Sequence, residues 1–314
     1  MNLNENKDIK PEIIEIPNSD TENIENIEKD SFLDYIIKYS KKIFIFNSIV
    51  LLISFILLLY FTISIDRFDN NFILNQVLKY SLIIIIQYAM ALLVINYNTK
   101  VNYTRKVIHM SYFLLPQLID NVIIKYKKNI YTECWNIWII LFLLLLISEE
   151  IRKRFNFINV MFKAVDRPED RPYTLIWFSS QVIFTLIIII PFSVYFSKIE
   201  KEHLIFIPIL INALGDGLAE PVGIRFGKNK YKTRACFSSR EYERSFEGSF
   251  CVFIVSLIII LCYIPYLSIN QVLFCLFLIP ISSTVAEAYA PHTWDSPIIT
   301  LVVCSLLSIS QQMK

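Results

Sequence analysis

The chain has 314 residues, of which 55% are hydrophobic and only 18% are charged, and its formal net charge is +2. Soluble globular proteins carry about a quarter charged residues, whereas 38 consecutive residues from Ser249 to Ala286 contain no charged side chain at all. A run of that length is enough for two membrane crossings. The composition therefore excludes a soluble enzyme, a nucleic-acid-binding domain and a disulfide-stapled secreted module. It predicts an all-α fold, a polytopic integral membrane helical bundle.

The first 30 residues differ from the rest, because they hold nine acidic and three basic residues and are rich in Asn and Glu. Such a segment cannot bury enough apolar surface to offset the entropy of ordering it. Residues 1–30 are therefore expected to form a disordered acidic cytosolic tail, and their acidity argues against a cleaved signal peptide. The six cysteines include no CxxC pair, so neither a zinc site nor a disulfide framework is expected.

Apolar stretches of about 20 residues predict spans near 43–65, 73–95, 107–124, 131–148, 173–196, 203–222, 249–268, 271–289 and 296–311. The third contains Pro116 and Asp120 and the last is short, so we expect about 8–9 transmembrane helices. Residues 31–100 would supply two additional N-terminal transmembrane helices, and 101–314 a catalytic membrane domain.

Lysine and arginine are concentrated in alternate loops, as the positive-inside rule requires of cytosolic loops. Three lysines precede the first span, and the loops 149–172 and 223–248 carry six and seven Lys/Arg residues. Three lysines in 125–128 are the exception, since they fall on the outer side. The distribution favours nine spans, with the N-terminus and the active site in the cytosol of a multi-pass membrane protein.

All five glycines of the chain lie between 215 and 248. Glycine is needed where the backbone approaches another group closely or takes a positive φ. The same window holds two carboxylates and a basic loop, the groups that a nucleotide triphosphate site requires. Asp216 and Glu220 are four residues apart and share a helix face. An ionisable residue within a span is a functional candidate, although Asp216 could instead pair structurally with an Arg or Lys of the bundle.

Two further charged segments border the cytosolic side. Arg105 and His109 are also four residues apart, at the entrance to the third span, and so share a helix face. Together with Lys106 they form a basic triplet, which could instead be only a positive-inside anchor. The last cytosolic turn carries Glu287 and Asp295, of which Asp295 is the stronger functional candidate.

These residues resemble the motifs of the CTP-dependent lipid-alcohol kinases, the family of dolichol, phytol and farnesol kinases and the yeast-type diacylglycerol kinase, over about residues 101–300. The opening motif is matched by Arg105-Lys106-Val107-Ile108-His109, and the central motif by Gly215, Asp216, Ala219, Gly223, Phe226, Gly227 and Lys228. The third is similar to Arg244-Ser245-Phe246-Glu247-Gly248-Ser249, with Arg in place of the usual Lys, and the last is matched only at Asp295.

The resemblance implies a membrane kinase that uses CTP as donor, Mg²⁺ as cofactor and a membrane lipid as acceptor, with no nucleic-acid partner. Asp216 would hold Mg²⁺, with Asp295 as a second ligand, and His109 and Arg105 would line the same pocket. Residues expected to bind the nucleotide phosphates are Gly215, Gly223, Gly227, Lys228, Lys230, Arg244, Ser245 and Gly248.

Two other functions stay open. A phosphatidate cytidylyltransferase, which makes CDP-diacylglycerol, would need similar Mg²⁺ and phosphate ligands. A transporter would use the intramembrane carboxylates for ions or substrate, but transporters usually repeat such features in two halves, and here the glycines mark one region only.

Overall fold

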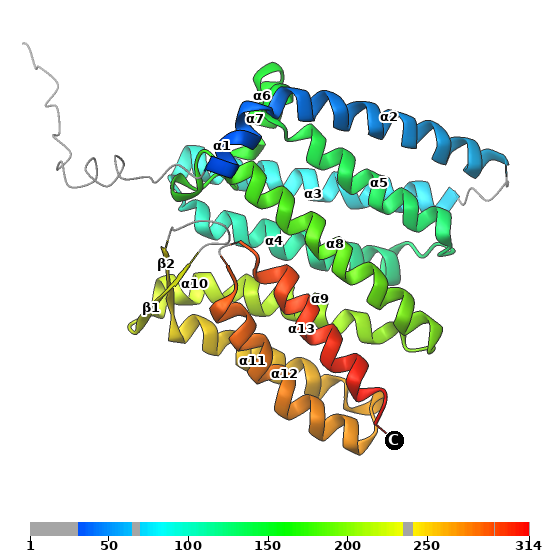
Figure 1. Ribbon diagram of the computed structural model, residues 1–314, viewed down its shortest axis with the longest axis vertical. Coiled ribbons are helices and arrows are strands. Elements are labelled where there is room, and N and C mark those ends of the chain that lie inside the picture. The colour runs from blue at the N-terminus through cyan, green and yellow to red at the C-terminus, as the bar shows by residue number, and fades with distance from the viewer. Residues whose placement is uncertain (1–30, 65–69, 235–240, 292, 314) are drawn as a thin grey trace, which may run out of the picture.

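The computed structural model describes residues 31–64, 70–234, 241–291 and 293–313. The expected N-terminal tail, 1–30, lies outside the described residues, and so does Cys236. Long helices lie roughly side by side, and the chain ends at the opposite end of the bundle from the strands β1 and β2 (Figure 1).

Among the described residues, the N-terminal half contains helices and no strand. Its elements are α1 (Ser31–Lys38), α2 (Ser40–Ser64), α3 (Asn70–Tyr97), α4 (Val101–Leu118), the π-helix η1 (Ile119–Ile123), α5 (Ile130–Leu146), α6 (Glu149–Arg154) and α7 (Asn156–Phe162).

The described residues of the C-terminal half are also mostly helical and include one hairpin. Its elements are η2 (Pro168–Asp170), α8 (Thr174–Lys198), η3 (Glu202–Ile205), α9 (Phe206–Leu210), the π-helix η4 (Ile211–Asp216), α10 (Gly217–Phe226), β1 (Lys230–Arg234), β2 (Glu241–Ser245), α11 (Phe246–Cys262), η5 (Ile264–Tyr266), α12 (Ile269–Tyr289) and α13 (Asp295–Ser310).

Five helical segments of the described chain are long and apolar enough to cross a membrane: Ser40–Ser64, Asn70–Tyr97, Thr174–Lys198, Glu202–Phe226 and Ile269–Tyr289. Three shorter helices, α5, α11 and α13, are also apolar. These segments fall where spans are predicted, and the predicted third span corresponds to α4 and η1. The mostly helical fold and the presence of membrane-length helices agree with the sequence prediction.

The exception to the all-α expectation is the antiparallel pair β1–β2, in which Lys230 is opposite Ser245 and Arg234 is opposite Glu241. The strand residues alternate between exposed and partly buried side chains. Apolar residues are few in both strands, so hydropathy gives no signal for them. The hairpin matters for the site because it brings Arg244 and Ser245 to the start of α11.

The largest cluster of buried apolar side chains lies between α8, the segment from η3 to η4, α11, α12 and α13. One smaller cluster joins α3, α4 and α7, and another joins α2, α3 and α5. Residues 31–100 are therefore not a detached unit, since α3 packs along α4 and a buried ion pair of 2.7 Å joins Lys79 to Asp120.

Close approach, rather than positive φ, explains the glycines where α10 crosses the start of α11. None of the glycines has a positive φ. A Cβ atom added at Gly248 would lie 2.6 Å from the carbonyl oxygen of Ala219, and one at Gly223 would lie 2.6 Å from the Ser245 hydroxyl. A Cβ at Gly215 would meet only ordinary contacts, the nearest at 3.5 Å. Gly223 and Gly248 thus let the two helices approach closely.

Candidate functional site

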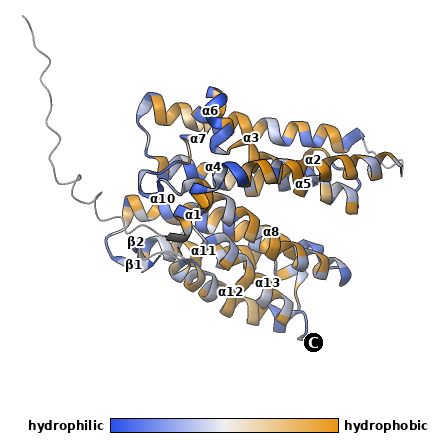
Figure 2. Cartoon of the chain, turned by 45° about the horizontal axis from the view of Figure 1, so that its top comes forward, coloured by the Kyte–Doolittle hydropathy of each residue, from blue (hydrophilic) through white to orange (hydrophobic). Residues whose placement is uncertain are grey.

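The polar end of the bundle contains the residues that the sequence motifs single out. Figure 2 shows hydrophilic residues gathered around α6, α7, α10 and the hairpin, whereas the long helices are hydrophobic along their middle. At this end α4 packs against η4 and α10, and α10 packs against α11. Side chains from these elements, from the segment before α8, from the end of α12 and from the start of α13 form two ion-pair clusters.

The first cluster is centred on Asp216, which is only 2% exposed. The Lys106 ammonium donates to the Asp216 carboxylate Oδ1 at 2.7 Å and to its main-chain oxygen at 2.9 Å. Lys106 is itself 3% exposed. Asp216 therefore has a buried cationic partner, as expected if it pairs structurally with a Lys or Arg of the bundle. Its other carboxylate oxygen, Oδ2, is buried and makes no hydrogen bond.

His109 lies beside that free oxygen. Its ring nitrogen Nε2 is 3.2 Å from Asp216 Oδ2 and 3.1 Å from the main-chain oxygen of Asn212. A carbonyl oxygen can only accept a hydrogen bond, so Nε2 carries a proton and Nδ1 is the nitrogen with a lone pair when the ring is neutral. The side-chain oxygen of Asn212 is also buried without a hydrogen-bond donor. Two uncommitted acceptor oxygens, one on Asn212 and one on Asp216, thus occur four residues apart along the π-helix η4.

Glu220 joins the same cluster one turn further along α10. It is paired with Arg105 and with Arg167, whose Nη1 is 3.1 Å from Glu220 Oε1, and it accepts from the Asn102 side chain at 2.8 Å. Arg167 also donates to Asp170 at 2.7 Å. Burial alone would lower the pKa of Arg167, but the carboxylates of Glu220 and Asp170 outweigh it and raise that pKa.

The second cluster is centred on Arg244, at the end of β2. Its guanidinium contacts the Glu287 carboxylate with one nitrogen and donates to Asp295 Oδ1 at 2.5 Å with another. Ser249 donates to the other Glu287 oxygen at 2.9 Å. Burial would lower the pKa of Arg244, but Asp295 and Glu287 raise it well above its usual value. A planar fork is suited to bridging two carboxylates in this way.

The two clusters are electrostatically connected, because the charge of Asp216 contributes to raising the pKa of Arg244. Together they contain four Lys or Arg residues and six carboxylates in the described part of the chain: Arg105, Lys106, Arg167 and Arg244, and Glu169, Asp170, Asp216, Glu220, Glu287 and Asp295. We call these ten residues the charged network. Counted without His109, it has two carboxylates in excess.

Among the residues expected to bind phosphate only Lys228 and Lys230 are exposed, whereas Gly215, Ser245 and Gly248 are buried. Ser245 is the N-cap of α11 and accepts from the Gly248 main-chain N–H at 3.1 Å. Lys228 and Lys230 are exposed; the Lys228 main-chain N–H donates to Glu247 at 3.0 Å, and the Lys230 ammonium is 3.2 Å from Glu243. The structure thus brings Ser245 and Gly248 together, while Lys230 faces solvent from the hairpin.

A metal site is only partly formed by these side chains. Within the described residues, no group of three or more His, Cys, Asp or Glu side chains is arranged to hold a metal ion. Asp216 and Asp295 are each paired with a cation of the protein instead. However, Mg²⁺ commonly uses one or two carboxylates together with substrate phosphates rather than a full protein cage. The free oxygen of Asp216 fits that requirement, and Asn212 offers a second oxygen nearby.

Sequence reasoning missed three partners of the network. The sequence indicates Lys106 only as a member of the basic triplet and of the opening motif, with no role of its own, and it does not indicate Arg167 or Asn102. The signal for Lys106 was its position next to Arg105 at the start of a span. No local pattern distinguishes Arg167 from the other basic residues of its loop.

Comparisons with known proteins identify no relative: no family model, no curated protein and no solved structure matches the chain.

Proposed function

We propose that the protein is an integral membrane kinase that transfers the γ-phosphoryl group of CTP to the hydroxyl of a polyprenol, phytol or diacylglycerol-type lipid. The observation that carries the proposal is the charged network with His109 beside it. Four sequence motifs that are far apart in the chain contribute Arg105, Asp216, Arg244 and Asp295 to one end of the bundle. Buried ionisable groups inside a membrane protein usually mark a functional site.

The charge balance supports Mg²⁺ and a triphosphate as ligands. An excess of two carboxylates disfavours a bare polyanion but favours a divalent cation, and the bound cation would itself attract phosphate. Asp216, through its free Oδ2, would hold the ion, with Asn212 beside it and Asp295 as the ligand suggested by the motif. The ion would neutralise phosphate charge, which is most of what phosphoryl transfer requires of a protein.

The phosphates would lie between the hairpin and the start of α11. Lys228 and Lys230 are exposed there and can turn toward an anion, while Ser245 and the Gly248 N–H line the neighbouring crossing of α10 and α11. Arg244 already bridges two carboxylates. In the proposal Arg244 mainly positions Glu287 and Asp295. It could bind a phosphate only if its guanidinium gave up the ion pair with one of these carboxylates.

His109 is the candidate base for the lipid hydroxyl. Its Nε2–H is committed to the Asn212 carbonyl oxygen, so Nδ1 would accept the proton. Its ring lies 5.0 Å from that of Phe113, further along α4. A lipid alcohol lying along α4 would bring its hydroxyl from the apolar side of the site.

The proposal includes a topology of nine spans, the eight apolar helices and α4 with η1, and it puts the charged network in the cytosol. Two observations support the sidedness: basic loops alternate along the sequence, and α1, α6, α7 and the hairpin lie at one end of the bundle (Figure 1).

The direct test is a reaction of the purified protein in lipid nanodiscs with CTP, Mg²⁺ and a panel of lipid alcohols. Phosphorylated lipid and CDP should form in equal amounts, and chelation of Mg²⁺ should stop the reaction. The Asp216→Asn variant should lose about a thousandfold in rate or more. Normal activity of this variant, or activity that persists after chelation, would contradict the proposed role of Asp216.

A further inference from the structure

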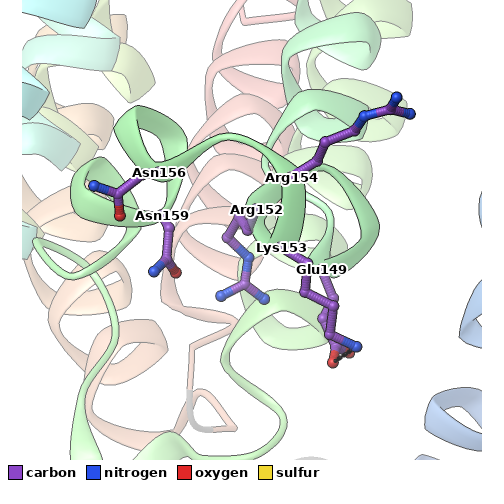
Figure 3. A pocket seen from close by; sticks show the side chains of 6 residues that line it. All are labelled: Glu149, Arg152, Lys153, Arg154, Asn156 and Asn159. Atoms are coloured by element: carbon purple, nitrogen blue, oxygen red, sulfur yellow. Dashed lines mark ion pairs between the residues drawn. The ribbon is translucent and has the colours of Figure 1, made fainter.

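A second charged feature, separate from the network, lies at the turn between α6 and α7. It is a pocket of about 400 Å³ lined by Glu149, Arg152, Lys153, Arg154, Asn156 and Asn159. Figure 3 shows the Arg152 guanidinium and the Asn159 carboxamide on the same side of this turn, whereas the Arg154 side chain extends away from them. None of these residues has a role in the proposed kinase reaction.

Arg152 is a cation without an anionic partner. Its guanidinium carbon is 3.6 Å from the centre of the Phe162 ring, which fixes the side chain in place. Its Nε atom is buried without a hydrogen bond, and no carboxylate of the described residues is within ion-pair distance of it. Burial lowers the pKa of Arg152, against the opposing effects of Asp166 and Glu149. A bound anion would relieve this uncompensated charge.

The nearest carboxylate of the pocket is already neutralised, since Glu149 pairs with Lys153 at 2.7 Å. Arg152 therefore keeps its positive charge available, and the Asn159 carboxamide supplies a further donor on the same side (Figure 3). A guanidinium with an adjacent N–H donor is a good match for a phosphate group.

The surroundings of the pocket favour a lipid as the source of that phosphate. Phe155 and Phe157, at the start of α7, are 54% and 50% exposed. Phe157 stacks on Tyr88 at 5.0 Å, and Tyr88 belongs to α3, one of the membrane-length helices. Exposed aromatic rings next to basic side chains are typical of a segment that lies at a membrane surface and contacts anionic lipids.

We propose that the α6–α7 pocket binds the phosphate of an anionic phospholipid from the cytosolic leaflet. Arg152 and Asn159 contact the phosphate, and Phe155 and Phe157 lie among the adjoining acyl chains. The loop that follows α7 carries Arg167 to Glu220, so the pocket and the charged network are joined by a short segment of chain.

The test titrates the full-length protein in detergent micelles with short-chain phosphatidylglycerol and, separately, short-chain phosphatidylcholine. Binding is read from the rise in the unfolding temperature. Phosphatidylglycerol should bind and phosphatidylcholine should not. Arg152→Gln should weaken binding by about fivefold or more, and Asn159→Asp should do so as well because it places a negative charge beside the phosphate at nearly unchanged size.

Arg154→Gln is the matched control, because it removes the same charge from a side chain that borders the pocket but extends away from Arg152 and Asn159 (Figure 3). Equal losses in Arg154→Gln and Arg152→Gln would overturn the pocket in favour of diffuse surface attraction. Asn159→Asp keeps the test decisive if Arg152→Gln does not fold, and unchanged binding by Asn159→Asp would contradict the proposal. Displacement of the lipid by inorganic phosphate would overturn the lipid assignment and leave a site for a soluble anion.

Discussion

The buried pair of Lys106 and Asp216 allows stability and catalysis to be separated by a mutant cycle. Both residues are at most 3% exposed, and their charges are 2.7 Å apart. At an effective dielectric constant of about 20 this distance corresponds to about 6 kcal/mol of attraction, most of which offsets the cost of burying the two charges. Asp216→Asn leaves the Lys106 ammonium uncompensated and should lower the unfolding free energy by about 3–5 kcal/mol. Lys106→Met should have a similar effect.

The double variant, Lys106→Met with Asp216→Asn, removes both charges and should recover all but about 1–2 kcal/mol of the stability. It should not recover lipid phosphorylation, because the carboxylate proposed to bind Mg²⁺ is still absent. Unfolding free energies would come from denaturant titrations of the protein in micelles, and rates from transfer of the γ-phosphoryl group of CTP. Recovery of activity together with stability would show that Asp216 is only structural.

The chain contains a matched control for this cycle. Lys79 and Asp120 form a pair of the same two residue types at the same distance of 2.7 Å, between α3 and η1. Lys79→Met and Asp120→Asn should each destabilise the protein, and the double variant should be restored. Unlike the Lys106–Asp216 double variant, this one should keep its activity. Loss of activity in the restored control would mean that the assay reports general damage to the bundle.

Three further predictions concern packing, bridging and sidedness. Gly248→Ala should destabilise the crossing of α10 and α11 by about 1–3 kcal/mol, because its Cβ would lie 2.6 Å from a main-chain oxygen. Gly215→Ala, with a nearest contact of 3.5 Å, should leave the unfolding free energy nearly unchanged. Arg244→Lys keeps the charge but cannot bridge two carboxylates, so its unfolding free energy should fall by about 1–3 kcal/mol; unchanged stability would contradict the bridging role. Cys236, in the basic loop, should react with a membrane-impermeant maleimide only after the cytosolic face is exposed, and labelling of intact cells would reverse the topology.

The position of the helices could be predicted from the sequence, because charge-free apolar stretches of membrane length are a strong signal. The hairpin could not, since its strands have few apolar residues, although the alternation of Tyr231 and Thr233 with lysines is a weak period-two signal. The third span is predicted to begin near residue 107, whereas α4 begins at Val101. The helix continues into the π-helix η1, in which Asp120 is paired with Lys79. That pairing joins residues 41 positions apart and has no local signature.

The members of the candidate site could be predicted better than its pairing. Asp216, Arg244 and Asp295 were selected from motifs, and the structure brings them to one end of the bundle. The sequence does not indicate which cation neutralises which carboxylate, because this depends on how α4 packs against α10. For this reason the sequence does not indicate that Lys106 and Arg167 neutralise carboxylates of the site, although both are buried.

The position of the transferred phosphorus is the most direct test of the proposed function. Nanodisc-bound protein should be given Mg²⁺, mixed lipid alcohols and phosphatidate, with CTP labelled at either the γ or the α position. The kinase proposal predicts γ label in the lipid, none from the α position, and weak competition by unlabelled ATP. Label from the α position alone, with release of pyrophosphate, would contradict the kinase proposal and indicate a cytidylyltransferase, and transfer from neither position would favour a transporter.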